Sequence, residues 1–112
     1  MPAIMLKVNV PVSEEKETVL KTKLGEAIGL IPGKSENWLM VCIEDNQKLY
    51  FRASKDEKLA FAVVKLLGKA KREDYERLTG GITEIMEAEL GIAHTYVQYE
   101  ETEHWGYNGS NF

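Results

Sequence analysis

The first two residues, Met1 and Pro2, could give this chain a reactive amine. If Met1 is removed, Pro2 presents a secondary amine on a rigid ring. An ordinary α-amino group has a pKa of about 7.7–8.0, and burial in an apolar pocket or a nearby lysine lowers it. A base whose pKa lies near the working pH is the most effective proton acceptor. Two alternatives stay open: the proline only favours removal of Met1, or Met1 stays and the Pro2 nitrogen is an amide that cannot accept a proton.

The other residue types that usually carry chemistry are few. The single cysteine, Cys42, cannot form an internal disulfide. One cysteine and two histidines are also a poor set of ligands for a zinc ion. We expect Cys42 to be a buried, inert thiol, and His94 and His104 to lie at the surface. No metal site is predicted.

The composition is that of an ordinary globular domain. The length of 112 residues predicts a single domain over 1–112, and 44% hydrophobic residues argue against disorder. The net charge of −4 gives no basic footprint for nucleic acid. No stretch approaches the roughly 18 apolar residues of a membrane-spanning helix, and Ile4–Val10 alternates in polarity, unlike a signal peptide. We therefore expect a cytoplasmic protein without nucleic-acid or membrane partners.

The first half of the chain, about 1–56, predicts a strand, a helix and a strand. Residues 3–10 alternate between apolar and polar, which is typical of a strand. Apolar residues at helical spacing, with acids in the first turn, predict a helix over about 13–29. The nearly continuous apolar run 37–45 predicts a strand that is covered on both faces. A short extra strand is expected at 49–51.

The second half, about 57–112, repeats this order without visible sequence identity. Residues 59–67 are apolar apart from one lysine, which predicts a buried strand. Apolar residues over 75–90 share one helix face, and a glycine follows them. The last full strand is expected at 95–99, before a tail that begins acidic and ends aromatic.

Two strand–helix–strand (β-α-β) units of this kind predict an α/β (α+β) domain. Each unit should form a right-handed crossover between parallel strands. Together the units make one four-stranded mixed sheet with two helices on one face. Two helices cover only one face of a sheet, yet the strands at 37–45 and 59–67 are apolar on both faces. The uncovered face must therefore meet something else, and further copies of the chain are the economical answer.

Short motifs occur in a family-typical order along the whole chain. The chain begins Met1-Pro2, has Pro32-Gly33-Lys34 after the first predicted helix, and carries Leu66-Leu67-Gly68-Lys69. It ends Trp105-Gly106-Tyr107-Asn108-Gly109-Ser110-Asn111-Phe112. Together with the two β-α-β halves, these motifs resemble the macrophage migration inhibitory factor family of the tautomerase superfamily.

The resemblance implies a homotrimer whose sheets surround a central axis, with active sites at subunit interfaces that are lined from two chains. It also implies a keto–enol tautomerase that acts on small α-keto acids or enols, such as phenylpyruvate, and needs no cofactor. Such a reaction moves one proton between carbon and oxygen. It therefore needs a base, a donor or cation near the developing enolate, and a dry pocket.

By the same resemblance, Pro2 is the catalytic base, and Lys34 holds a substrate carboxylate and polarises the carbonyl. The backbone N–H of Leu67 is implied to contact the substrate. The implied pocket wall consists of aromatic, amide and apolar side chains: Trp38, Tyr96, Gln98, Trp105, Tyr107 and Phe112. The plainer alternatives are a solvated loop lysine at Lys34 and ordinary strand packing for Trp38 and Tyr96.

The chain departs from the family pattern at several positions. Gln98 stands where the mammalian proteins carry asparagine, so the same amide has a longer reach. Leu59 and Ala62 stand at the positions of a mammalian Cys-x-x-Cys pair. No thiol oxidoreductase activity is expected, because that activity needs two thiols.

The resemblance leaves a second function open. Proteins of this family also act as cytokine-like signalling or effector proteins, in which the pocket is mainly a binding feature. That alternative adds a host receptor to the expected partners, and secretion without a signal peptide to the expected locations. A trimeric scaffold with an inactive pocket is a third alternative, which a retained Met1 or a blocked Pro2 would support.

Overall fold

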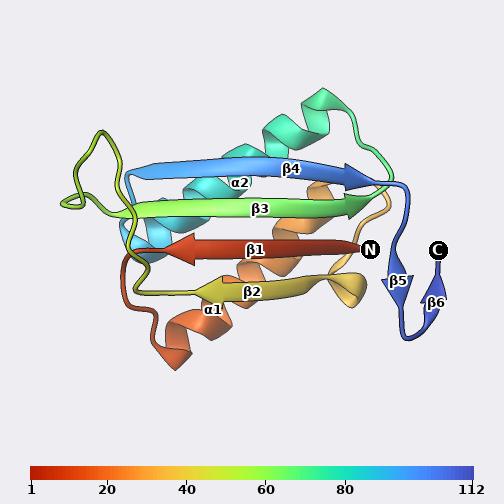
Figure 1. The fold of residues 1–112 in the computed structure, drawn as a ribbon, viewed down its shortest axis with the longest axis horizontal. Coiled ribbons are helices and arrows are strands. Elements are labelled where there is room, and N and C mark those ends of the chain that lie inside the picture. The colour runs from red at the N-terminus through yellow and green to blue at the C-terminus, as the bar shows by residue number, and fades with distance from the viewer.

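The first half of the chain forms two strands joined by a helix (Figure 1). The computed structural model describes residues 1–112. The elements of this half are β1 (Pro2–Val8), α1 (Glu14–Ala27), the short 3-10 helices η1 (Ile28–Leu30) and η2 (Glu36–Trp38), and β2 (Met40–Glu44). Helix α1 begins where the Ser13 hydroxyl accepts a hydrogen bond from the backbone N–H of Lys16, 3.2 Å away.

The second half repeats this arrangement and adds a small hairpin. Its elements are β3 (Leu59–Leu67), α2 (Arg72–Leu90), β4 (His94–Thr102), β5 (Gly106–Tyr107) and β6 (Ser110–Asn111). The β5–β6 turn consists of Asn108 and Gly109, whose φ angles are 46° and 91°. An Asn-Gly pair with two positive φ angles is the favoured two-residue hairpin turn.

The four long strands form one mixed sheet in the order β2-β1-β3-β4. Strand β1 is parallel to β2, β3 is parallel to β4, and the two central strands β1 and β3 are antiparallel. Each parallel pair is connected through its helix, so the predicted α/β (α+β) fold of two β-α-β units is confirmed. The register places Pro2 opposite Leu66, so the start of β1 lies beside the end of β3.

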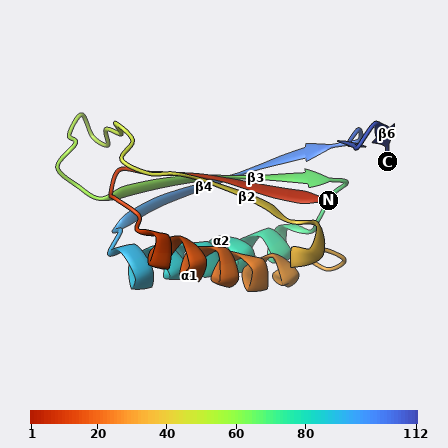
Figure 2. The same ribbon diagram turned by 90° about the horizontal axis from the view of Figure 1, so that it is seen from below.

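Both helices pack on one face of the sheet, as Figure 2 shows. The core between the two layers is a cluster of 17 buried hydrophobic residues. Its largest fully buried side chains include Ile4, Leu6, Leu20, Leu24, Leu66, Leu78, Ile82 and Met86. These residues are the apolar positions that alternate along the strands or recur at helical spacing. The apolar face of the sheet and the apolar faces of the helices therefore pack into one core.

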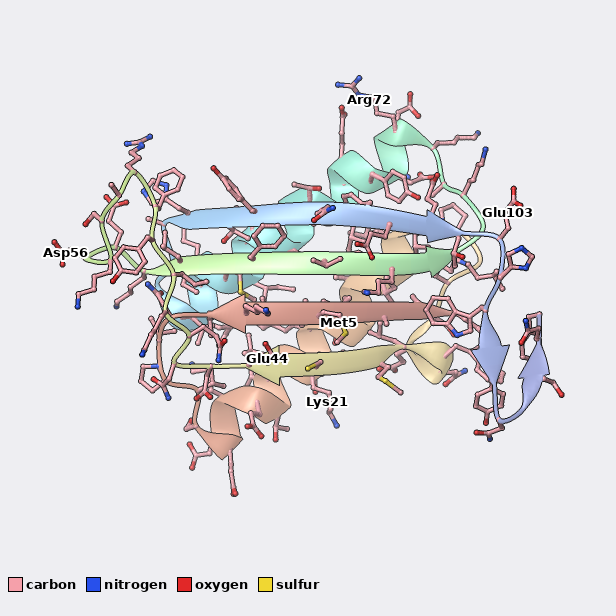
Figure 3. The ribbon with its side chains drawn as sticks, viewed as in Figure 1. Met5, Lys21, Glu44, Asp56, Arg72 and Glu103 are labelled. Carbon is pink, nitrogen blue, oxygen red and sulfur yellow. The ribbon has the colours of Figure 1, made fainter.

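The opposite face of the sheet carries no helix (Figure 2), and Figure 3 looks onto it. Met5 lies on this face near the middle of the sheet. Two ion pairs between neighbouring strands flank the apolar centre: Lys7 with Glu44 at 3.8 Å, and Lys65 with Glu100 at 3.4 Å. Its exposed large side chains are Met40, Phe61 and Tyr96. A single chain therefore leaves a mixed apolar and charged sheet face uncovered.

Two predicted strands differ from the observed ones. The strand expected at 37–45 begins only at Met40, because the preceding residues form η2 and the N–H of Leu39 donates to the carbonyl of Glu36 at 3.2 Å. The extra strand expected at 49–51 is wrong. Phe51 pairs only with Ser54, in an isolated bridge across a tight turn, so this segment hydrogen-bonds to itself instead of to the sheet.

Smaller differences concern element ends. The first strand ends at Val8 instead of residue 10, and the last runs over His94–Thr102 instead of 95–99. The predicted helix 13–29 is α1 followed by the tighter turn of η1. Cys42, expected to be buried, is half-buried.

Candidate active site

The candidate site begins at Pro2, the first residue of the central strand β1. Pro2 is buried. A proline is tolerated at the first position of a strand, because it has no N–H to donate to the ladder. With Met1 attached, the Pro2 nitrogen is a tertiary amide, so the amino group of this chain lies one residue further out.

Three segments meet around the bond between Met1 and Pro2. Gly33, with a φ angle of 82°, turns the chain after η1 and brings Lys34 to this end of the sheet. The Lys34 Nζ donates a hydrogen bond to the Leu67 carbonyl oxygen at 2.8 Å. The Leu67 N–H donates in turn to the Met1 carbonyl oxygen at 3.2 Å. The structure therefore brings Pro2, Lys34 and the backbone of Leu67 together at one end of the sheet.

The amino terminus is a weaker proton acceptor here than in an unfolded chain. Partial burial is the largest cause that lowers the pKa of the Met1 α-amino group, because it disfavours the charged form. The positive charge of the nearby Lys34 ammonium lowers this pKa further, and so does hydrogen bonding between the two groups. Lys34 is thus close enough to an amine at this end of β1 to tune its basicity.

Exposed aromatic rings gather at the same end of the sheet. The rings of Trp38 and Tyr107 meet edge-to-face with centroids 5.3 Å apart, and those of Tyr107 and Phe112 lie 6.3 Å apart. Their exposed fractions are 50%, 47% and 59% in the order Trp38, Tyr107, Phe112. Tyr107 and Phe112 belong to the tail hairpin, which lies beside the amino terminus in Figure 1 and Figure 2. Trp38 is therefore part of an exposed aromatic cluster and not a strand residue.

Trp105 closes the tail hairpin. Its carbonyl oxygen accepts a hydrogen bond from the N–H of Phe112 at 2.9 Å, and its side chain is half-buried. This bond fixes the last residue of the chain against the start of the hairpin. The tail is therefore held in a conformation that leaves the rings of Tyr107 and Phe112 exposed.

Tyr96 and Gln98 lie elsewhere in the same chain. On β4 they pair with Phe61 and Val63, whereas Glu101 pairs with Leu66, the partner of Pro2. Tyr96 precedes Glu101 by five residues, so it is about 16 Å from the Pro2 end of the sheet. Both side chains are exposed. A single chain does not bring these two predicted pocket residues to Pro2.

An apolar hollow of about 260 Å³, which no sequence pattern predicts, lies at the start of β4. It is lined by Leu49, Tyr50, Phe51, Leu59, Ala60, Phe61, His94 and Tyr96. His94, expected at the surface without a partner, lies 2.8 Å from the Glu57 carboxylate and stacks on Phe51 at 4.7 Å. Several aromatic residues occur in these segments, but only the sheet register shows that they meet.

No group of three or more His, Cys, Asp or Glu side chains is placed to hold a metal ion. No helix has the length and apolar content needed to cross a bilayer.

Residues 1–112 match the family described as macrophage migration inhibitory factor (MIF). No curated protein sequence matches the chain.

Among solved structures, MIF2 of Leishmania major is 28% identical, with a TM-score of 0.92 over 100% of this chain and 97% of that one. The MIF-like protein of Entamoeba histolytica is 19% identical, with a TM-score of 0.86 over 99% and 98%. Pt0534 inactivated by 2-oxo-3-pentynoate is 13% identical, with a TM-score of 0.79 over 89% and 85%. The last two likenesses show the fold alone.

The chain thus matches one family from end to end. It contains a strand that starts at Pro2, a lysine beside the amino terminus and two β-α-β units. The chain belongs to the macrophage migration inhibitory factor family, within the tautomerase superfamily.

Proposed function

We propose that the protein is a cofactor-independent keto–enol tautomerase for phenylpyruvate-type α-keto acids. Pro2 is the general base, and removal of Met1 makes it available. Two hydrogen bonds beside the Met1–Pro2 bond carry the proposal. The Lys34 Nζ donates to the Leu67 carbonyl oxygen at 2.8 Å, and the Leu67 N–H donates to the Met1 carbonyl oxygen at 3.2 Å. Removal of Met1 leaves a secondary amine at a place where Lys34 already lowers the pKa of an amine.

Removal of Met1 also frees a hydrogen-bond donor. The Leu67 N–H now donates to the Met1 carbonyl oxygen, which is bonded to the carbon that acylates Pro2. Without Met1, this N–H points to the space beside the Pro2 nitrogen and lacks an acceptor, which is unfavourable for a half-buried backbone group. A substrate oxygen can take the place of the Met1 carbonyl oxygen there.

These groups supply what the reaction needs. The Pro2 amine takes a proton from the carbon next to the keto group, and the electron pair of that C–H bond moves toward the carbonyl oxygen. The Lys34 ammonium holds the substrate carboxylate and, with the Leu67 N–H, stabilises the negative oxygen. The protonated Pro2 then gives the proton to that oxygen, so the net change is an isomerisation of keto to enol.

The aromatic cluster supports a flat substrate. Trp38, Tyr107 and Phe112 offer exposed rings beside the amino terminus, and such rings exclude water from a bound aryl group. Pt0534, which shares this fold, is inactivated by 2-oxo-3-pentynoate, itself a 2-oxo acid. This supports an α-keto acid substrate class for this chain.

A homotrimer completes the pocket. Along β4, Tyr96 is about 16 Å and Gln98 about 10 Å from the Pro2 end within one chain, and the sheet face that bears them is uncovered. A head-to-tail contact between copies joins two different surfaces and closes into a ring when the rotation fits. In such a ring, Tyr96 and Gln98 of the adjacent copy line the pocket that contains Pro2.

Phenylpyruvate ketonisation, followed by absorbance, tests the proposal on protein whose intact mass confirms loss of Met1. A processed Pro2→Gly variant keeps an amine but loses the rigid ring, and we expect its kcat/KM to fall by about tenfold or more. Lys55→Ala, in an exposed loop, is the matched control and should keep the parent rate. A processed, trimeric parent with no activity above buffer would refute the proposal.

A further inference from the structure

The ring of Tyr96 is held from two sides by other aromatic rings. Phe61, its register partner on β3, meets it edge-to-face with centroids 5.9 Å apart and planes at 80°. Phe51, from the loop between β2 and β3, meets it at 5.9 Å and 81°. Tyr96 itself stays 57% exposed, so these two rings, more than burial, determine where it points.

The contact of Phe51 with Tyr96 depends on a short series of interactions that hold the Phe51 ring. The Phe51 ring stacks on His94 with centroids 4.7 Å apart and planes at 28°. The Nε2 of His94 lies 2.8 Å from the Glu57 carboxylate, at the other end of the same loop. The Arg52 guanidinium lies over the Phe51 ring at 4.9 Å. Position 51 is therefore fixed by the ring of His94 and by its own loop.

The backbone at this position is constrained as well. Phe51 and Ser54 exchange backbone hydrogen bonds of 2.8 Å and 3.0 Å across Arg52 and Ala53. Both of these central residues have positive φ angles, 53° and 62°, which is costly for residues other than glycine. Phe51 also lines the apolar hollow of about 260 Å³, together with His94 and Tyr96. A loop held in this strained turn, with its aromatic residue against Tyr96, is suited to positioning that ring.

We infer that Phe51 is a positioning residue for substrate selection. It holds the ring of Tyr96 in the orientation that meets the aryl group of a substrate bound at Pro2 of the adjacent copy. Phe51 thereby favours aryl α-keto acids over small aliphatic ones. The inference rests on the proposed function and adds to it a residue that does not itself touch the substrate.

The test compares Phe51→Ala with the parent on phenylpyruvate and on pyruvate. For both acids the rate is read as loss of the C3 proton signal in D2O by NMR. Loss of an edge-to-face contact should raise KM for phenylpyruvate by about three- to tenfold and leave kcat within about twofold. Exchange of pyruvate, which has no ring, should be unchanged. Phe51→Leu keeps apolar volume without a ring and should behave like Phe51→Ala, whereas Phe51→Tyr should restore the parent KM.

Tyr50→Ala is the matched control, because Tyr50 is in the same loop, is 66% exposed and makes no ring contact with Tyr96. It should keep the parent values for both acids. An unchanged phenylpyruvate KM in the Phe51 variants, or an equal loss of activity on both acids, would overturn the inference and leave the proposed function standing. A processed parent that exchanges neither acid would overturn both.

Discussion

Replacing Lys34 by methionine tests the two roles that we propose for this side chain: it tunes the basicity of the amine, and it holds the substrate carboxylate. Lys34→Met keeps an unbranched side chain, one atom shorter, and removes the charge. The Lys34 Nζ lies 2.8 Å from the Leu67 carbonyl oxygen, and its charge lowers the pKa of the amino group at this end of β1. After Met1 is lost, the terminal amine is that of Pro2, one residue further along the chain and still at the end of the sheet where Lys34 lies. The variant should therefore have a more basic Pro2 amine.

The direction of the shift follows from Coulomb's law. Two like unit charges about 4 Å apart repel by about 1 kcal/mol in water and about 4 kcal/mol at an effective dielectric constant of 20. Lys34 is half-buried, so its surroundings lie between these two limits. Removal of the lysine charge favours the protonated Pro2 amine, so we expect the pKa of this amine to rise.

The assay is the pH dependence of kcat/KM for phenylpyruvate. The base must be unprotonated, so the acid limb of the profile should move to higher pH in Lys34→Met. The plateau should fall by about 10- to 150-fold, because a hydrogen bond to a charged carboxylate is worth about 1.5–3 kcal/mol. Lys69→Met removes an exposed lysine two residues after Leu67. This control should change neither the position of the acid limb nor the plateau. An acid limb that stays in place or moves lower in Lys34→Met would refute the electrostatic role of Lys34.

Two further predictions concern the helix layer and the tail. Glu89 bridges Lys23 and Lys16, and its pKa is lowered chiefly by hydrogen bonding to Lys23. Stability from this carboxylate is present above its unfolded pKa of about 4.3 and is lost as the pH falls through the lower folded pKa. Glu89→Gln should therefore lower Tm at neutral pH, with a difference from the parent that shrinks in acid; a difference independent of pH would contradict this. Gly109→Val places a β-branched residue at a φ angle of 91°, which costs about 1–2 kcal/mol locally. Because the hairpin is exposed, KM for phenylpyruvate should rise severalfold while Tm changes little, and a large fall in Tm with an unchanged KM would be the contrary result.

The main helices and strands could be predicted because apolar residues recur along each of them with one dominant spacing. Ile4, Leu6 and Val8 alternate along β1 and are all buried, so the strand and its core face follow from spacing alone. The segment around Trp38 has no such period. Its apolar character fits a strand equally well, and it leaves the sheet to meet Tyr107, which is nearly seventy positions away in the sequence.

The site could be predicted only in part, for a related reason. No local pattern distinguishes Lys34 from other loop lysines, and the role we propose for it comes from the resemblance of a whole set of motifs. Its contact with Leu67 joins the loop after η1 to the end of β3, and no short segment encodes that contact. The stacking of Phe51 on His94 likewise joins a loop to a strand end. Such contacts are properties of the tertiary structure, so sequence spacing could not predict them.

The most direct test of Pro2 as the base uses no substitution. Protein that retains Met1, expressed with methionine aminopeptidase inhibited, is compared with fully processed protein of the same sequence, and intact mass verifies both. A tertiary amide cannot accept the proton, whereas general-base catalysis contributes about 10²- to 10⁴-fold. We predict that the processed protein ketonises phenylpyruvate at least about 100-fold faster than the Met1-retaining form, whose rate should be that of buffer. Equal rates in the two forms would contradict a catalytic role for the Pro2 amine.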